Sequence, residues 1–277
     1  AARSPHTFER QASDRCRDAS IHHTRTRMLP IFRTTALMTV SAALLAGCHK
    51  PYTVDGPEGY VRLKVEATWQ GQPLQAGEVH LNVSNYRTQV EVLKMYLAEL
   101  RLTGPGGASA LTDIALFDAL NGGDSEVYTA EAGSYSGLHL GLGVPQDLNS
   151  SDPVLYPVGH PLSVSNGTYW TWATGYRFVM FDGRYDTDPN GTGTPMSLFS
   201  IHTGMEPCYR VRDLDFAAPF TVVGGDTTEL VLRFEVDRFF HDNGVVIDLA
   251  VDHQAHGDNL TLAMRFTDNV LNSIVVE

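Results

Sequence analysis

The sequence predicts an all-β fold, a single antiparallel β-sandwich domain. Apolar and polar residues alternate over short segments, which is the period of half-buried strands. Glycine and proline separate these segments, with 25 Gly and 14 Pro among 277 residues; both residue types favour turns. The segments do not alternate with helices, as strands of a parallel α/β sheet would.

The first half of the domain supplies several of these segments. Val61, Leu63 and Val65 share one face of an expected strand, and residues 79–83 repeat the pattern. Residues 92–102 predict a long strand, with a helix as an alternative at its start. A Gly/Pro turn at 104–107 and strands at 111–116 and 133–142 follow.

The second half is more irregular. Residues 143–159 and 182–195 are rich in loop-forming residues, and they flank an aromatic strand predicted over 169–181. Further strands are expected at 197–202, 220–223, 229–236 and 260–266. Residues 236–240 and 268–271 are expected to begin helical turns.

The region before the domain is interpreted as an export signal. Residues 1–27 are polar and basic, and are either a mis-assigned upstream start or a disordered extension. Residues 28–47 contain an apolar run too short to span a bilayer stably, as in a lipoprotein signal peptide. Residues 48–58 form a tether, and the domain is predicted over 59–277.

The apolar run ends in Leu45-Ala46-Gly47-Cys48, which resembles the lipobox of bacterial lipoproteins. Cys48 is therefore the predicted lipidation site and membrane anchor. The residues after it are His49 and Lys50, without the Asp that signals inner-membrane retention. By resemblance to Gram-negative lipoproteins, we expect a periplasmic protein, with anchoring in the outer membrane favoured.

The charge of the chain excludes one class of partner. The formal net charge is −12, and the segment before Cys48 is basic, so the domain itself is more acidic still. Nucleic-acid binding requires a basic surface and is not expected. The acidity is compatible with a cationic partner, and equally with simple solubility.

The remaining cysteine and the histidines are the candidate metal ligands. Cys208 is either a buried apolar residue or a soft ligand. The histidines of the domain are His80, His139, His160, His202, His241, His253 and His256. Imidazole is the commonest metal ligand in proteins. His253 and His256 could reach one site if their segment is a turn or a helix.

Residues 169–178 (YWTWATGYRF) are the unusual segment. Trp170 and Trp172 lie two residues apart, so on a strand they share one face. The local pattern favours an aromatic stripe in the core, and Gly175 could introduce a bulge. The sequence contains no G-x-S-x-G, H-E-x-x-H or P-loop motif. We therefore predict that the protein is not an enzyme.

Several segments, taken in order, resemble a known family. They are 93–102 (LKMYLAELRL), 133–138 (GSYSGL), 140–145 (LGLGVP) with Leu148-Asn149, 169–178, 201–204 (IHTG) and 268–270 (DNV). On these residues the chain resembles the MbnP-like family of periplasmic copper-binding proteins, and the related metallo-mystery pair four-Cys proteins. The W-x-W-x-x-G-Y motif is the most specific part of the match.

The resemblance implies a β-sandwich that binds copper with the help of histidines. It also implies a partner, a MauG-like di-haem peroxidase, that oxidises a Trp to kynurenine; Trp170 and Trp172 are the candidates. His202 matches the family's His-x-Gly histidine and is the first ligand candidate, and His253 is the second.

The chain also departs from the family pattern. Family histidines are missing from Ala67-Thr68-Trp69 and from Ile114-Ala115-Leu116, and Ser150 stands where four-Cys members carry a His. Of the four family cysteines only Cys208 remains. The copper site is therefore rebuilt from His80, His139 or His256, degraded, or absent. The alternative function is a surface scaffold or adhesion module with a degenerate metal site.

Overall fold

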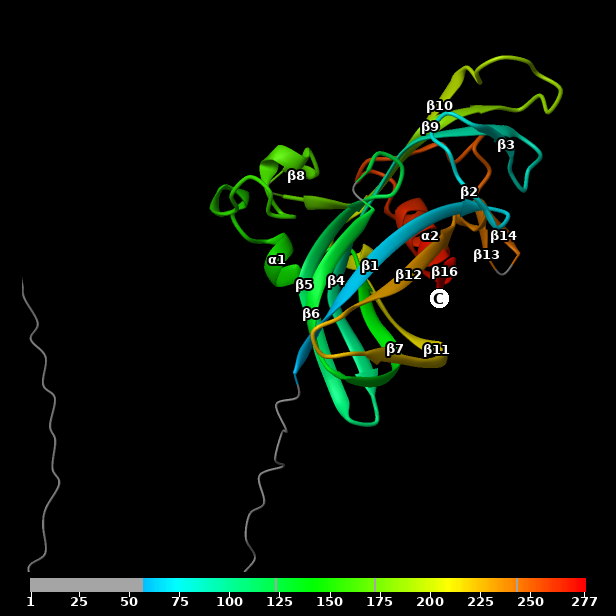
Figure 1. Cartoon of the computed structure of the whole chain (residues 1–277). Helices are drawn as coiled ribbons and strands as arrows, with labels where there is room; N and C mark the ends of the chain where they lie inside the picture. Colours follow the sequence, from blue (N-terminus) through cyan, green and yellow to red (C-terminus); the bar gives the residue numbers. More distant parts are fainter. Residues whose placement is uncertain (1–56, 123, 172, 243) are drawn as a thin grey trace, which may run out of the picture. The chain divides into compact units, whose positions relative to one another are not determined.

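The computed structural model describes residues 57–277 except 123, 172 and 243. The proposed leader, signal peptide and lipidation site Cys48 lie outside these residues, as does Trp172. The described strands form a five-stranded and a nine-stranded sheet, together with a two-stranded ribbon (Figure 1). The predicted all-β, sandwich-like fold is confirmed.

The smaller sheet is built around β1 (Glu58–Trp69). Its order is β16 (Ile274–Val276), β12 (Thr227–Glu235), β1 and β2 (Gln72–Pro73), while β6 (Ser125–Glu131) also pairs with β1. The β1–β12 pairing is parallel, so the sandwich is mixed and not purely antiparallel. This is feasible because the chain passes through the larger sheet between these two strands, which supplies the long crossover that a parallel pair requires.

The larger sheet is organised by the long strand β4 (Arg87–Gly104). Its order is β11 (Arg210–Val222), β7 (Gly133–Leu142), β4, β9 (Gly175–Asp186), β10 (Ser197–Gly204) and β15 (Gln254–Ala255). The strands β3 (Val79–Leu81) and β5 (Gly107–Asp118) also pair with β4, and β8 (Tyr169–Thr171) pairs with β9. Strands β13 (His241–Asp242) and β14 (Val245–Val246) form the ribbon. At one end β9 and β10 extend beyond the other strands of the sheet (Figure 1).

Short helical segments fill the connections. They are α1 (Gln146–Asn149), η1 (Pro153–Leu155), η2 (Val164–Asn166), η3 (Glu206–Cys208) and η4 (Val236–Phe240). The segment η4 begins where the sequence predicts a helical turn. Neither α1 nor the longer helix α2 (Leu260–Asn272) has the length and apolar character needed to cross a membrane.

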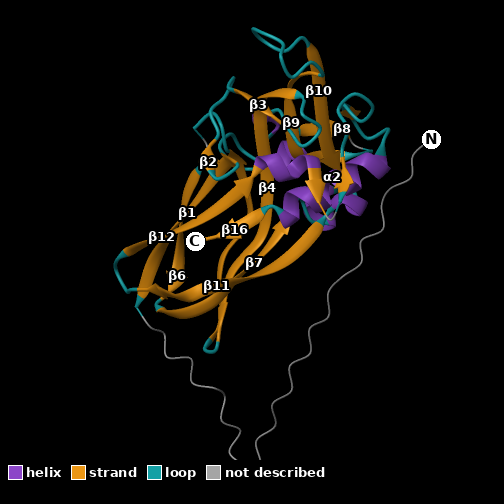
Figure 2. Ribbon diagram, turned by 90° about the vertical axis from the view of Figure 1, so that its right-hand side faces the viewer, coloured by secondary structure: helices purple, strands orange, loops and turns teal. Residues whose placement is uncertain are grey.

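The strand predicted over 260–266 is wrong, because these residues begin α2 (Figure 2). The Asn259 side chain accepts a hydrogen bond from the Leu262 amide at 3.1 Å and caps the helix. The buried residues Leu262, Phe266 and Val270 recur at helical spacing. The helix packs against β10.

The core is apolar and aromatic. Val61, Leu63 and Val65 are buried on one face of β1, as their alternation predicts. Phe266 of α2 stacks on Phe181 of β9, with ring centroids 5.4 Å apart. Burial of these side chains stabilises the fold through the hydrophobic effect and fixes the positions of β9 and β10.

Candidate metal centre

Three polar side chains share one face of the β9–β10 hairpin. Ser200 lies opposite Asp182, and His202 lies opposite Met180. Because strand side chains alternate between faces, Asp182, Ser200 and His202 point to the same side. Strand β15 extends the sheet beyond β10, with Gln254 aligned on Ser200. Two residues further along both strands, His256 therefore comes beside His202.

These side chains converge on one point. His202 Nε2 lies 2.9 Å from Asp182 Oδ1 and 3.1 Å from Oδ2. Ser200 Oγ lies 2.5 Å from Asp182 Oδ1 and 2.7 Å from His256 Nε2. The ring centroids of His202 and His256 are 4.9 Å apart. We refer to these two residues as the histidine pair.

The hydrogen-bond partners assign the protons. Gln254 Nε2 lies 3.1 Å from His256 Nδ1 and donates to it, which places the His256 proton on Nε2. His256 Nε2 then donates to Ser200, whose hydroxyl donates to Asp182. His202 Nε2 also donates to Asp182, so all the bonds in the cluster run toward this carboxylate.

The pKa values of Asp182 and His256 are both shifted, and each shift favours the protonation state that binds metal. Burial favours the neutral form of Asp182, but hydrogen bonds from His202 and Ser200 and the nearby imidazoles outweigh it and lower its pKa. Burial, followed by the repulsion of His202, lowers the pKa of His256. An ionised carboxylate and a neutral imidazole are the forms that bind metal.

Trp170 lies against the histidine pair. Its ring centroid is 6.0 Å from that of His202 and 6.2 Å from that of His256. It is half-buried, whereas Tyr176 and Phe178 are fully buried. The predicted single aromatic strand is divided into β8 and β9, and Gly175 lies at the junction with φ +71°. Trp170 therefore belongs to the site and not to the core.

The arrangement is not a ready-made metal cage. Within the described part of 57–277, no group of three or more His, Cys, Asp or Glu side chains is placed to hold a metal ion. The physical reason is that Asp182 and His202 hydrogen-bond directly to each other, so their donor atoms do not surround a shared centre. Metal binding requires small side-chain rotations at this cluster.

The comparison with known proteins identifies the family. Residues 58–259 match the family model of MbnP. The chain belongs to the MbnP family. This membership confirms the resemblance drawn from the sequence and associates the chain with copper-related function. No curated protein matches the chain.

A solved structure, MbnP from Methylosinus trichosporium, is also similar. It is 15% identical to this MbnP family member and aligns with a TM-score of 0.47. The alignment covers 66% of this chain and 78% of that one.

The other histidines predicted as ligands lie apart from the pair. His253 and His256 flank the two-residue strand β15, so the extended backbone turns His253 to the opposite face, where it stacks on Tyr185. His139 binds Asp213 on β11, with Nδ1 2.6 Å from Oδ1. His80 stacks on Trp69 with ring centroids 4.9 Å apart.

Cys208 is buried in η3. Its thiol interacts with the Gly204 backbone and with Thr267, and burial raises its pKa. A thiol held protonated in this way is a poor metal ligand.

Asp182 and Ser200 were not predicted as site residues. The sequence signal was present, because Ser200 and His202 are two residues apart on a predicted strand. Asp182, however, falls in a segment predicted to be a loop, and only the pairing of β9 with β10 reveals that it faces them.

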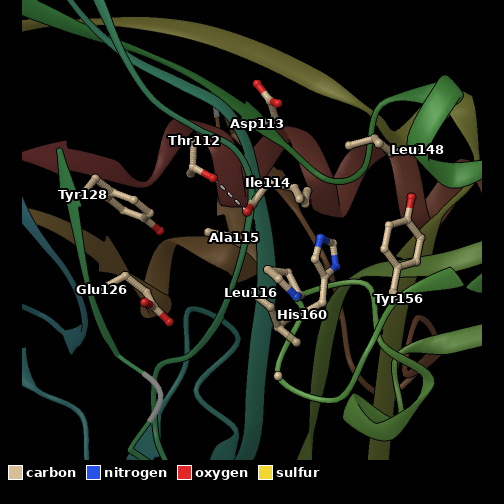
Figure 3. Close-up of a pocket in the computed structure, with 12 residues that line it drawn as sticks. Thr112, Asp113, Ile114, Ala115, Leu116, Glu126, Tyr128, Leu148, Tyr156 and His160 are labelled. Carbon is tan, nitrogen blue, oxygen red and sulfur yellow. Dashed lines mark hydrogen bonds between the residues drawn. The ribbon is translucent and has the colours of Figure 1, made fainter. Parts of the chain in front are cut away.

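A separate hollow lies between β5, β6 and the loop after α1 (Figure 3). It has a volume of about 440 Å³, and its walls include Glu126, Tyr128, Tyr156 and His160. His160 stacks on Tyr156 with ring centroids 4.4 Å apart, and its Nδ1 accepts the Leu162 amide at 3.0 Å. The histidine pair does not line this hollow.

Proposed function

We propose that this MbnP family protein binds copper at the histidine pair, beside Trp170. The observation that carries the proposal is the 4.9 Å separation of the His202 and His256 rings, with Trp170 against both. Single histidines on a protein surface are usually structural. Here two histidines converge from different segments, next to Trp170 of the family W-x-W motif, and this arrangement favours a ligand role.

The donor set fits copper. Imidazole nitrogens are common copper ligands. For His256, binding through Nε2 requires the proton to move to Nδ1, where the amide of Gln254 can turn to accept it. Such a contact from outside the ligand shell fixes the ring and raises its affinity for metal. The protein would then hold the ion without a change in the charge of this imidazole.

We further propose that Trp170 is the residue oxidised to kynurenine by a partner MauG-like di-haem peroxidase, with hydrogen peroxide as the oxidant and the indole C2 carbon lost as formate. Support comes from its half-buried position and its contacts with the pair. The measurement is peptide mass spectrometry of protein produced with and without the peroxidase. The mass shift of kynurenine is expected on the peptide with Trp170, and unmodified Trp170 after co-production contradicts this proposal.

The proposed role is binding and not catalysis. Ser200 and His256 are within hydrogen-bond distance, but the serine hydroxyl donates its proton to Asp182. A serine activated by His256 as a general base would donate its proton to the His256 ring instead.

The proposed location is the periplasm, with Cys48 lipidated and the outer membrane as the anchor site. A Cys48→Ala variant should move from the membrane to the soluble periplasmic fraction. Equal membrane association of both proteins would contradict the anchor.

Copper titration tests the binding proposal. The wild type should bind one equivalent, whereas His202→Ala and His256→Ala should each weaken binding on the order of tenfold to a hundredfold. His139→Ala is the matched control, because His139 also hydrogen-bonds a carboxylate but has no second histidine. Equal binding by all four proteins, or by none, would overturn the proposal.

The scaffold or adhesion alternative retains one supporting observation. Among the described residues no set of three acidic, histidine or cysteine side chains is pre-arranged around a metal position. If the wild-type protein fails to bind copper before and after Trp oxidation, the sandwich is better explained as a structural module.

A further inference from the structure

We infer that the hollow between β5, β6 and the loop after α1 binds a small organic cation, an alkylated ammonium ion with apolar carbon atoms around its charge. The volume of about 440 Å³ falls in the range of small-molecule sites. His202 and His256 do not line the hollow, so a ligand here would be bound independently of copper. Three features support such a ligand: the position of the hollow in the fold, the charge of its walls, and the aromatic rings beside it.

The hollow lies beside β6, which pairs with β1 alone among the described strands and so forms an edge of the smaller sheet. In this pairing Glu126 lies opposite Leu63, and Tyr128 lies opposite Val61. Leu63 and Val61 are fully buried, and residues opposite each other in a sheet point to the same face. Glu126 and Tyr128 therefore point to the inner face of the sheet. At positions where a core strand would carry apolar side chains, the hollow has a carboxylate and a phenol.

The walls carry negative charge that no basic residue balances. Asp113 of β5 and Glu126 of β6 line the hollow, and no lysine or arginine is among the described residues that line it. Neither carboxylate forms an ion pair within the described part of the chain, whereas Asp118, at the end of β5, lies 3.4 Å from Lys94 Nζ. A concave surface lined by one sign of charge attracts ions of the opposite sign. The hollow should therefore attract cations and repel anions.

Aromatic rings border the hollow on two sides. Figure 3 shows Tyr128 on one side of β5, and Tyr156 with His160 on the other. The Tyr156 hydroxyl donates to Ser151 Oγ at 2.8 Å. His160 Nδ1 accepts the Leu162 amide at 3.0 Å. These bonds hold the rings in place before a ligand arrives, which lowers the entropic cost of binding. Aromatic faces attract cations, and quaternary ammonium ions are recognised in this way.

The apolar residues of the hollow favour an organic cation over a metal ion. Ile114, Leu116 and Leu148 line it and suit a ligand with apolar surface. No three acidic, histidine or cysteine side chains in the described part of 57–277 are placed to hold a metal. The Tyr128 hydroxyl has no hydrogen-bond partner among the described residues. Burial, followed by the charge of Glu126, raises its pKa, so it remains a neutral donor for a hydroxyl group of the ligand.

The test is titration of the full-length, copper-free protein with choline, a quaternary ammonium ion that carries one hydroxyl group, monitored by ligand-observed NMR. Neohexanol is the control ligand, because it is the uncharged carbon isostere of choline. Choline should bind saturably and at least about tenfold more tightly than neohexanol, and its affinity should fall at high salt. Equal affinity for the two ligands, or no binding of choline, would overturn the inference.

Variants of the walls locate the binding. Glu126→Gln removes one charge and keeps the shape, and should lower choline affinity by about two- to tenfold. Glu131→Gln is the matched control, because Glu131 is also an exposed carboxylate of β6 but does not line the hollow. Tyr156→Leu removes a ring and should lower the affinity by about two- to thirtyfold. Tyr156→Phe keeps the ring and should bind choline as the wild type does, which separates the loss of the ring from a folding defect seen in thermal melts.

Edge protection is the competing explanation for Glu126, because an inward-pointing charge on an edge strand prevents pairing between molecules. Under that explanation Glu126→Gln should form oligomers on size-exclusion chromatography and bind choline as the wild type does. Wild-type choline affinity in either Glu126→Gln or Tyr156→Leu would overturn the inference. Copper binding should be the same in both variants as in the wild type, so that the failure of one proposal leaves the other standing.

Discussion

The guanidinium of Arg177 lies over the indole ring of Trp170, with its carbon 5.1 Å from the ring centroid. Arg177 Nη1 also donates to the Gly167 carbonyl at 2.8 Å, which ties the start of β9 to the loop before β8. Burial lowers the pKa of Arg177, although the residue stays charged. Trp170 therefore contacts both a cation and the histidine pair.

Arg177→Gln should make the protein less stable but strengthen its copper binding. Loss of the cation–π contact is expected to lower the free energy of unfolding by about 0.5–2 kcal/mol. Removal of a positive charge from beside a cation site should strengthen divalent copper binding, most clearly at low ionic strength. Chemical denaturation and copper titration of the same preparation measure both. Weaker copper binding together with unchanged stability would contradict this account of Arg177.

Gly175→Ala should displace the β8–β9 junction and with it Trp170. Gly175 has φ +71°, and an added Cβ would lie 2.2 Å from Asn149 Oδ1. That amide oxygen accepts the Tyr176 N–H at 2.8 Å, so the clash breaks a buried hydrogen bond. The matched control is Gly167→Ala, which has φ +69° but nothing within 4 Å of the added Cβ.

Backbone strain alone costs about 1–2 kcal/mol and applies to both variants. The clash should make Gly175→Ala less stable than the control by at least about 1 kcal/mol in the free energy of unfolding. Copper affinity should fall only for Gly175→Ala. Equal destabilisation by the two substitutions would contradict this prediction, because the Asn149 side chain would then move aside without lowering the free energy of unfolding.

The sequence predicts strands well where one face is buried and the other is exposed. Val61, Leu63 and Val65 alternate because β1 has an inner and an outer face. The prediction failed at 260–266 because Leu260, Leu262, Met264 and Phe266 also alternate, and a short apolar run fits either period. β6 was missed because its residues are mostly exposed and carry little pattern.

The site was predictable only in part. His202 follows from its family motif, and Trp170 from the aromatic segment. The positions of Asp182 and His256 beside His202 depend on which strands are neighbours, and pairing between distant segments leaves no local pattern in the sequence. The spacing of His253 and His256 was misleading because it brings side chains together on a helix but separates them on a strand.

His80 should make stability depend on pH. Burial lowers its pKa below the usual 6.5, which outweighs the opposing effect of Glu78. The unfolded chain thus binds a proton more readily than the folded protein does. The stability contributed by neutral His80 is fully present above a pH of about 6.5 and is lost as the pH falls below it.

His80→Phe removes the titrating group and retains stacking on Trp69. The variant should lose less stability than the wild type between neutral and mildly acidic pH, measured by denaturant unfolding at each pH. His139→Phe serves as the comparison. Identical pH profiles for the wild type and His80→Phe would rule out His80 as a source of acid sensitivity.

Trp170 should report metal binding through its fluorescence. Of the two tryptophans that the structure describes, Trp170 has a ring that contacts both histidines of the pair, whereas Trp69 stacks on His80 at β1. Cu(II) quenches an indole by electron or energy transfer over short distances, so quenching should depend mainly on Trp170. In protein with unmodified tryptophans, Trp170→Phe should lose most of the quenching, and Trp69→Phe should retain it.

Zn(II) has a filled d shell, and it should bind the same donors with little quenching in any of the proteins. Full quenching in Trp170→Phe would contradict this prediction, because the quenching would then come from another tryptophan.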